Sequence, residues 1–156
     1  TPSILLLHDD DLNPETTRLP LKDVVGIALL NTTEKRSLKG VAQNVHDFVE
    51  AGLKDAVHRL SSTHTMPLCN ADVNSILQLA HRTGAKRIIY VYAPVGPTQD
   101  TINSLTTQLD AAVNHNRLAI EKCVREWDTE CWPHATKGFF NFKKNIPMIL
   151  ANRDIL

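Results

Sequence analysis

Three consecutive carboxylates, Asp9, Asp10 and Asp11, follow His8 at the end of the apolar run at residues 4–7. Clustered carboxylates suit a hard cation such as Mg²⁺. We favour a solvated acidic turn as the explanation of the same residues, and we predict no metal site here. The seven His are scattered and the cysteines show no zinc-ligand spacing, so a zinc centre is not indicated either.

A second group of chemically useful residues lies between Tyr92 and Thr98, where an apolar run meets Pro94, Gly96 and Pro97. If Thr98 caps a helix, the free N–H groups at that helix start would face a phosphate or a planar ligand. Gly96 would let the backbone approach such a ligand closely. The alternative is that residues 94–97 form a rigid turn with no ligand.

Ligands of open α/β sheets bind beyond the carboxyl ends of the strands, where the strand order reverses. The loops at residues 8–11, 31–33, 92–98 and 125–128 are candidates for such ends. No residue is predicted to be catalytic, because no thiol is linked to a particular His and no nucleotide-hydrolysis motif is present. The predicted cofactor-binding residues are His8, Asp9, Asp11, Tyr92, Pro94, Gly96, Thr98 and Trp127.

The segment at residues 71–92, ADVNSILQLAHRTGAKRIIYVY, indicates the element types that position these residues. It predicts an amphipathic helix with Asn70 as N-cap, a stop at Gly84 in the left-handed conformation, and an apolar strand at 87–93. A strand that is apolar throughout is typical of a parallel sheet covered on both faces.

The rest of the chain repeats this alternation. Strands are expected at 4–7, 24–30, 66–69 and 118–124, the last near a sheet edge. A helix after residue 45 should bury Val45, Phe48 and Leu53, and another should bury one side from Ile102 to Val113. We therefore predict a doubly wound, Rossmann-like α/β fold with a parallel sheet of about five strands and helices on both faces.

The last part of the chain is rich in aromatic residues. We predict one domain over residues 1–156, in which about 127–156 form a C-terminal tail with a helix from about Gly138. The aromatic side chains could stack on a flavin-like ring or a partner domain, but we favour packing in a core. They are Trp127, Trp132, Phe139, Phe140 and Phe142.

Composition narrows the function classes. The chain has 17 basic and 17 acidic residues, which makes bulk electrostatic binding of nucleic acid unlikely for this chain alone. Three irregularly spaced cysteines favour a reducing intracellular compartment, the cytoplasm or an organelle if the N-terminus is processed. No apolar run approaches the roughly 20 residues of a membrane span, and no signal peptide is evident, so no membrane association is expected.

Four segments in order resemble the N-terminal α/β domain of the photolyase/cryptochrome family, with DASH-type members nearest. Residues 6–14, LLHDDDLNP, are similar to the turn after that family's first strand, and Phe48, Leu53 and Leu60 follow its helix pattern. Residues 79–90, LAHRTGAKRIIY, are similar to its helix–Gly–Ala–strand unit. Residues 127–147, WDTECWPHATKGFFNFKKNIP, look like the segment after its fifth strand.

The resemblance implies an antenna-type module, since such domains often hold a flavin, a deazaflavin or a folate. The loop at 93–100 lacks the Asn-Glu pair of folate-binding members, and the turn at His8 lacks the family's arginines. The chain also contains no large helical FAD-binding domain, so it is not expected to repair DNA by itself. Whether it catalyses any reaction is left open.

We therefore expect an accessory module in light sensing or DNA repair that binds a planar chromophore or a nucleotide. The alternative is a protein-interaction module, or a fragment that partners a separate flavin-bearing domain or forms a homodimer, with the aromatic tail as contact surface. A third hypothesis, an independent enzyme acting on a nucleotide through His8 or Asp9, is weaker.

Overall fold

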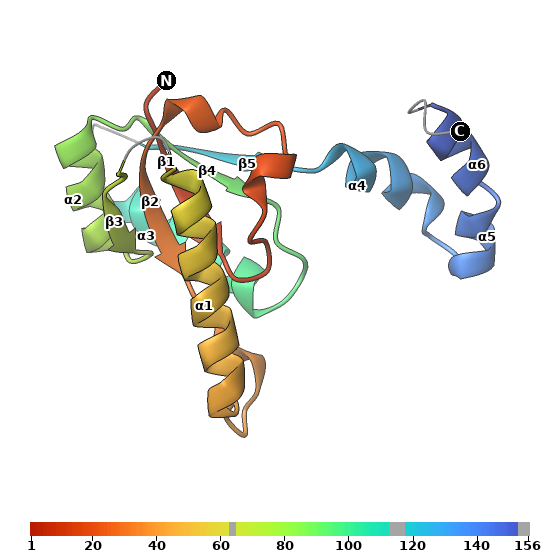
Figure 1. Ribbon diagram of the computed structural model, residues 1–156, viewed down its shortest axis with the longest axis horizontal. Coiled ribbons are helices and arrows are strands. Elements are labelled where there is room, and N and C mark those ends of the chain that lie inside the picture. The colour runs from red at the N-terminus through yellow and green to blue at the C-terminus, as the bar shows by residue number, and fades with distance from the viewer. Residues whose placement is uncertain (63–64, 113–117, 153–156) are drawn as a thin grey trace. The chain divides into compact units, whose positions relative to one another are not determined.

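The computed structural model describes residues 1–62, 65–112 and 118–152, and it divides the chain into two units, Thr1–Cys123 and Val124–Leu156 (Figure 1). The boundary between the units lies close to residue 127, where the aromatic tail was expected to begin.

The first unit contains a five-stranded sheet in the order β3-β2-β1-β4-β5. All four neighbouring pairs are parallel, which confirms the predicted doubly wound α/β class. The chain builds outward from β1 to β3 and then crosses to the other side for β4, so the strand order reverses between β1 and β4. The strands are β1 (Ser3–His8), β2 (Val24–Leu30), β3 (Leu68–Asn70), β4 (Arg87–Val91) and β5 (Ala119–Cys123).

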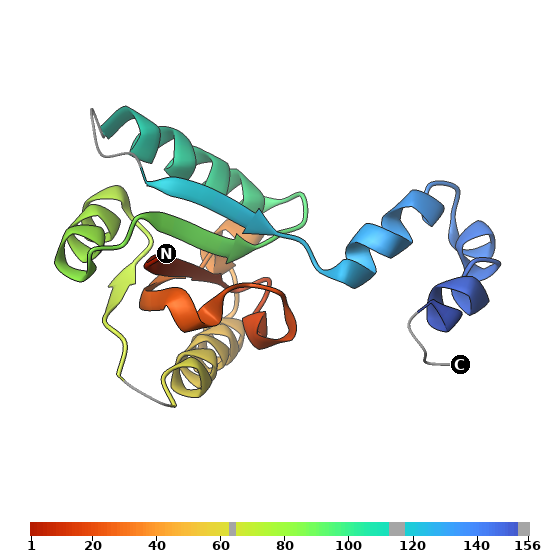
Figure 2. The ribbon, with the colours of Figure 1, turned by 90° about the horizontal axis from the view of Figure 1, so that it is seen from above.

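Helices cover both faces of this sheet (Figure 2). Leu5 and Leu7 of β1 face one core with α1 (Gln43–Leu60), whereas Ile4 and Leu6 face the other core with α2 (Val73–Thr83) and α3 (Pro97–Ala112). This division follows from the two-residue period of a strand, in which successive side chains point to opposite faces. Because β1 is buried on both faces, its sequence is a continuous apolar run rather than an alternating one.

The connection from β1 to β2 contains no α-helix. It consists of loops and two short 3₁₀ helices, η1 (Pro14–Thr16) and η2 (Leu21–Asp23). A third, η3 (Thr33–Arg36), follows β2. The residues after β1 and η3 place polar side chains at the carboxyl edge of the sheet, next to the point where the strand order reverses, whereas η2 leads into the amino end of β2.

The predicted buried face of α1 is wrong for its first two turns. Phe48 is 77% exposed and Val45 is also exposed, whereas Val49 and Leu53 are buried. Figure 1 shows the reason, since the N-terminal end of α1 extends beyond the carboxyl ends of the strands. The helix has no sheet to pack against there, so the apolar pattern continues past the surface that it could bury.

Two predicted helix caps also need correction. The N-cap of α2 is Asp72, not Asn70, and its side chain accepts a hydrogen bond from the Ser75 backbone N–H at 2.9 Å. Asn70 instead belongs to β3. Thr98 is not an N-cap either, because α3 begins at Pro97 and the Thr98 side chain is buried. The predicted stop at Gly84 is confirmed, with φ +70°.

The predicted boundaries are close for the other elements. Strand β4 ends at Val91 rather than residue 93, and β5 lies at the sheet edge as expected. Val113, predicted on the buried side of the third helix, lies outside the described residues. No helix in the described part of the chain is long and apolar enough to cross a membrane.

The second unit consists of short helices: α4 (Glu126–Cys131), η4 (Trp132–His134), α5 (Phe139–Lys143) and α6 (Ile146–Ala151). The single helix expected from Gly138 is therefore two helices, separated before Pro147, which occupies the first turn of α6. Core packing of the aromatic side chains was also wrong, since Phe139 and Phe140 are exposed and Ile149 is buried. Helices of five or six residues offer too little surface to enclose large rings.

Candidate functional site

The carboxyl ends of β1 and β4 are joined by His8. This residue ends β1, is 1% exposed, and its Nε2 lies 2.7 Å from the Val91 carbonyl oxygen. A carbonyl only accepts hydrogen bonds, so Nε2 carries the proton in this contact. Nδ1 has no hydrogen-bond partner in the described residues and is itself buried. His8 thus ties two strands together where the strand order reverses.

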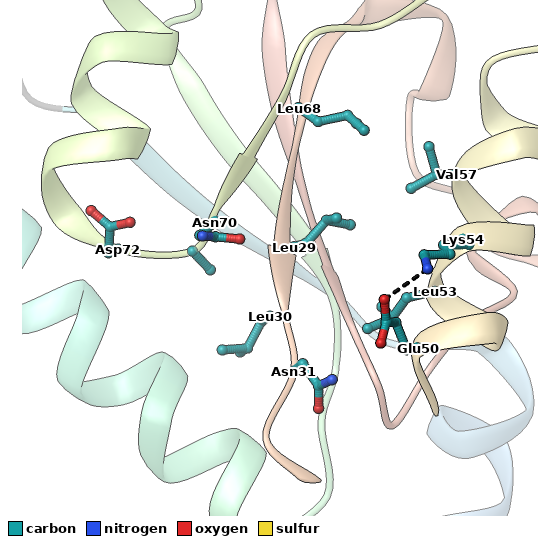
Figure 3. A pocket seen from close by; sticks show the side chains of 11 residues that line it. Leu29, Leu30, Asn31, Glu50, Leu53, Lys54, Val57, Leu68, Asn70 and Asp72 are labelled. Carbon is teal, nitrogen blue, oxygen red and sulfur yellow. Dashed lines mark ion pairs between the residues drawn. The ribbon is translucent and has the colours of Figure 1, made fainter. Parts of the chain in front are cut away.

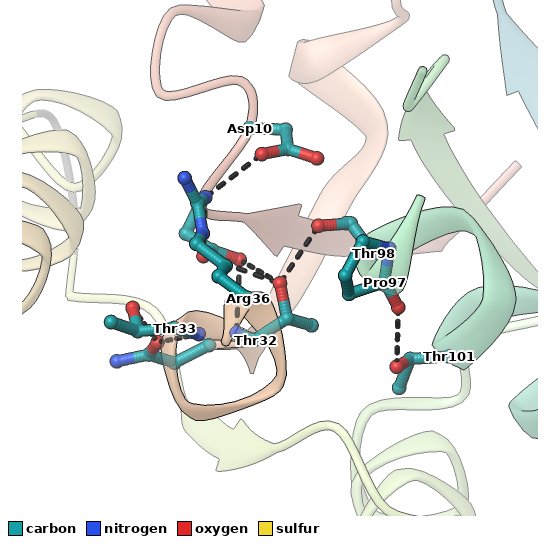
Figure 4. A network of polar contacts seen from close by, with 9 residues as sticks. Asp10, Thr32, Thr33, Arg36, Pro97, Thr98 and Thr101 are labelled. Atoms are coloured by element: carbon teal, nitrogen blue, oxygen red, sulfur yellow. Dashed lines mark hydrogen bonds and ion pairs between the residues drawn. The ribbon is translucent and has the colours of Figure 1, made fainter. Parts of the chain in front are cut away.

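Asp9 is the centre of a polar network in the same region (Figure 4). Its side chain is fully buried and accepts hydrogen bonds from the Thr32 backbone N–H and hydroxyl, both at 3.0 Å. Arg36 donates to Asp9 at 2.8 Å and to Asp10 at 2.8 Å. A buried carboxylate needs such partners, because an unpaired charge inside a protein is costly. Asp9 therefore holds η3 against the end of β1.

Thr98 extends this network to α3. Its hydroxyl lies 2.8 Å from that of Thr32, and both side chains are 1% exposed. The hydrogen-bonding groups of Asp9 and Thr98 are thus engaged by other parts of the protein. Any ligand that used them directly would have to displace Thr32 or Arg36.

The remaining predicted residues of the first unit lie nearby at the same edge. Asp11 accepts a hydrogen bond from the Asn13 N–H, and the Tyr92 N–H donates to the Cys123 carbonyl. Pro94 is exposed, and Gly96 has φ +150° with open space where a Cβ would stand. These residues therefore lie at the carboxyl edge of the sheet, where the sequence analysis expected them. Trp127 belongs to the second unit, where it is exposed.

A cleft of about 520 Å³ lies elsewhere along the carboxyl edge, beside β2 and β3, and we call it the α1–β3 cleft (Figure 3). Figure 3 shows Leu29 of β2 and Leu68 of β3 directed toward Val57 of α1. None of the eight residues predicted from sequence lines this cleft. Its lining residues are Leu29, Leu30, Asn31, Glu50, Leu53, Lys54, Val57, Leu68, Asn70, Ala71 and Asp72.

Polar side chains also line the α1–β3 cleft. Asn31 Oδ1 accepts hydrogen bonds from the backbone N–H and hydroxyl of Thr33, so its amide N–H₂ remains to donate. Lys54 forms an ion pair with Glu50 at 2.7 Å. Hydrogen bonds from Ser75 hold the pKa of the Asp72 carboxyl below its usual range, so Asp72 is charged at neutral pH.

Sequence reasoning missed this cleft because its walls come from three separate segments. The available signal was Leu68, an apolar residue in a strand of only three residues at the sheet edge. On the α1 face of the sheet, such a strand is covered only where side chains of α1 extend over it. The residues that line the remaining gap depend on the angle at which α1 crosses β2, and the sequence does not specify that angle.

No group of three or more His, Cys, Asp or Glu side chains within residues 1–62, 65–112 and 118–152 is placed to hold a metal ion. Comparison with models of known protein families, with curated proteins and with solved structures gives no match for this chain. The resemblance to the photolyase/cryptochrome family therefore stays a prediction.

Proposed function

We propose that this chain is a photolyase/cryptochrome-like accessory module that binds a planar chromophore or nucleobase-like ring in the α1–β3 cleft. The observation that carries the proposal is the cleft itself, an apolar space of about 520 Å³ at the carboxyl edge of a doubly wound sheet. Ligand pockets of about 300 to 1,000 Å³ with apolar walls and few polar groups are typical of small-molecule sites, and open α/β sheets bind ligands at this edge.

The walls suit the two faces of a flat ring. Leu29 and Leu68 line the sheet side, and Val57 lines the helix side. The amides of Asn31 and Asn70 also line the cleft, and they can pair with the carbonyl and N–H groups at the edge of a flavin, deazaflavin or pterin ring. Contact between the ring faces and the aliphatic side chains would provide affinity. Hydrogen bonds between the ring edge and the amides would fix the orientation of the ligand.

The charges of the cleft favour an uncharged ring over a phosphate-bearing ligand. Its charged residues are Glu50, Lys54 and Asp72, and the one cation is paired with Glu50. A phosphate would therefore meet two carboxylates and no unpaired cation within the lining. We expect riboflavin to bind more tightly than its 5′-phosphate.

The experiment compares three tryptophan substitutions in titrations with riboflavin, a deazaflavin and a folate, followed by ligand fluorescence. Val57→Trp fills the cleft and should weaken binding about tenfold or more, equivalent to about 1.4 kcal/mol. Ala51→Trp, on the exposed side of the same helix, should leave binding unchanged. Gly96→Trp tests the edge of β4, the location that the sequence indicated.

The results for the three variants distinguish a ligand in the α1–β3 cleft from a ligand beside β4. Loss of binding in Val57→Trp alone supports the α1–β3 cleft, whereas loss in Gly96→Trp alone places the ligand beside β4. If none of the three ligands binds the wild-type protein, and none is released from it on denaturation, the chromophore proposal fails. The second unit then favours the alternative function, a protein-interaction module, because Phe139 and Phe140 are exposed there.

A further inference from the structure

The outer edge of β3 presents main-chain groups that pair with no other strand in the described part of the chain. The Pro67 carbonyl accepts from the Ile27 N–H at 3.0 Å, and the Ala71 N–H donates to the Leu29 carbonyl at 2.9 Å, so both point toward β2. Main-chain groups of a strand alternate in direction with a two-residue period. The N–H and C=O groups of Leu68 and the N–H group of Asn70 therefore point away from the sheet, where β3 is the edge strand (Figure 2). The Asn70 carbonyl accepts from the Asp72 N–H at 2.9 Å, which leaves one of its two lone pairs for a further donor.

The two edges of the sheet differ in how they are protected. Strand β5, at the other edge, carries exposed Glu121 and Lys122. Charged side chains of this kind keep edge strands from pairing with other chains. Strand β3 carries no charge, and Leu68 is 45% exposed. The β3 edge thus lacks the protection that β5 has.

A polar stripe of α2 lies beside this edge. Ser75, Gln78 and Arg82 are three and four residues apart, and together with Cys69 and Leu68 they line a cleft of about 300 Å³. Arg82 is exposed and forms no ion pair with any residue that the structure describes. Asp72 stands at the opposite end of the same helix.

We propose that a second copy of this chain pairs with β3 through a twofold axis at Cys69, which joins the two sheets into one of ten strands. In antiparallel register, Leu68 of one protomer exchanges both main-chain hydrogen bonds with Asn70 of its partner, and Asn70 does the same with Leu68. The Asn70 carbonyl accepts the partner's N–H through the lone pair that the Asp72 N–H does not use. A twofold axis makes this contact self-complementary, as closed dimers require.

Charge complementarity selects a second copy as the occupant. Helix α2 runs back along β3, so Asp72 lies at the carboxyl end of the strand and Arg82 lies toward its amino end. Antiparallel pairing sets the two α2 helices antiparallel on one face of the joined sheet. Arg82 of each protomer then faces Asp72 and Ser75 of the other, and Gln78 lies near the axis.

This arrangement makes a sharp prediction for Cys69. Two Cys69 residues would form a non-hydrogen-bonded antiparallel pair, in which the Cα atoms are about 4.5 Å apart. Disulfides need Cα atoms within about 4.4 to 6.8 Å. The native thiol thus reports on the proposed register, because a shifted register would move the two Cys69 thiols too far apart to form a disulfide.

The first experiment oxidises the full chain with diamide, which takes two electrons and two protons from a pair of thiols. Burial raises the pKa of the Cys69 thiol, so the reaction is run at mildly alkaline pH to form the thiolate. We expect a covalent dimer on non-reducing gels that Cys69→Ser abolishes and that Cys123→Ser and Cys131→Ser retain. Cross-linking only through Cys123 or Cys131 would overturn the proposal.

The second experiment measures the non-covalent dimer by sedimentation velocity over a concentration series. Leu68→Lys adds an edge charge, and Arg82→Glu sets like charges against Asp72; both should shift the protein to monomer with an unchanged circular dichroism spectrum. Arg82→Lys should retain the dimer. A wild-type chain that is monomeric throughout, or a dimer that persists in both disruptive variants, would contradict the β3 interface.

Discussion

The hydroxyl of Thr32 lies 2.8 Å from the hydroxyl of Thr98, and this single hydrogen bond joins the residues after β2 to the first turn of α3. Thr32 also donates to the Asp9 carboxylate, which can only accept. The shared contact must therefore run from the Thr98 hydroxyl to the Thr32 oxygen. Elements on both sides of the strand-order reversal are thus held by a chain of directed hydrogen bonds.

Thr98→Val should destabilise the protein by about 1 kcal/mol, the typical net value of one buried hydrogen bond. The substitution keeps the branched shape but removes the only donor to the Thr32 oxygen at this contact. Urea denaturation followed by circular dichroism measures the change. Thr98→Ser, which keeps the hydroxyl, serves as the control, and a Val variant as stable as the wild type would show that the bond contributes nothing.

Gly26→Ala should destabilise the fold by about 1 to 3 kcal/mol through crowding. A Cβ at this position would stand 3.1 Å from both Cδ atoms of Leu79, a buried residue of α2. Thermal unfolding of Gly26→Ala, Leu79→Ala and the double variant measures the coupling. In the Leu79→Ala background the Gly26 substitution should cost less, and additive effects would rule out direct crowding.

Phe48→Gln should change the free energy of unfolding by less than about 0.5 kcal/mol, because exposed positions without special contacts tolerate substitution. Leu53→Ala in the same helix should cost about 2 to 5 kcal/mol, since Leu53 is buried against the sheet. Urea denaturation compares the two variants directly. A large loss in Phe48→Gln would mean that the first turns of α1 are covered in solution.

Tyr90 should lower stability at alkaline pH. Burial raises the pKa of its phenol above the ordinary value of 10.0, while a hydrogen bond with Gln99 acts in the opposite direction. The folded state thus holds the phenolic proton more tightly than the unfolded state does, so this contribution is complete below about pH 10 and declines as the pH rises further. Denaturation of the wild type and Tyr90→Phe across this range measures it.

The two proteins should diverge only in the alkaline range. Tyr90→Phe lacks the titrating group, so its stability should fall less steeply above about pH 10 than that of the wild type. Equal slopes would show that the phenol ionises equally well in both states, contrary to its burial.

The order of elements was readable from the sequence because local patterns encode it. Gly84 ends α2 in the left-handed conformation, and the apolar residues of β4 identify a strand buried on both faces. The residues from His8 to Asp11 and from Tyr92 to Thr98 were placed at one edge of the sheet, since the carboxyl ends of parallel strands meet there. These conclusions need only neighbouring residues and the parallel topology.

The burial and the hydrogen-bond partners of each side chain at that edge could be determined only from the tertiary structure. Asp9 and Thr98 look like available ligand-binding groups in the sequence, but Thr32 and Arg36 engage them from segments more than 20 residues away. Phe48 carries the helix pattern of a core residue, yet α1 has run beyond the sheet at that point. Burial is decided by which elements cross, not by local spacing.

By itself, then, the sequence determined the alternation of strands and helices and the parallel sheet, because periodicity and the stop at Gly84 act over a few residues. Only the tertiary structure decided that β3 is an open edge and that an apolar cleft lies between Leu68 and Val57. These features arise where segments distant in sequence meet or fail to meet. Their distances depend on how helices pack across the sheet, which no single stretch of residues specifies.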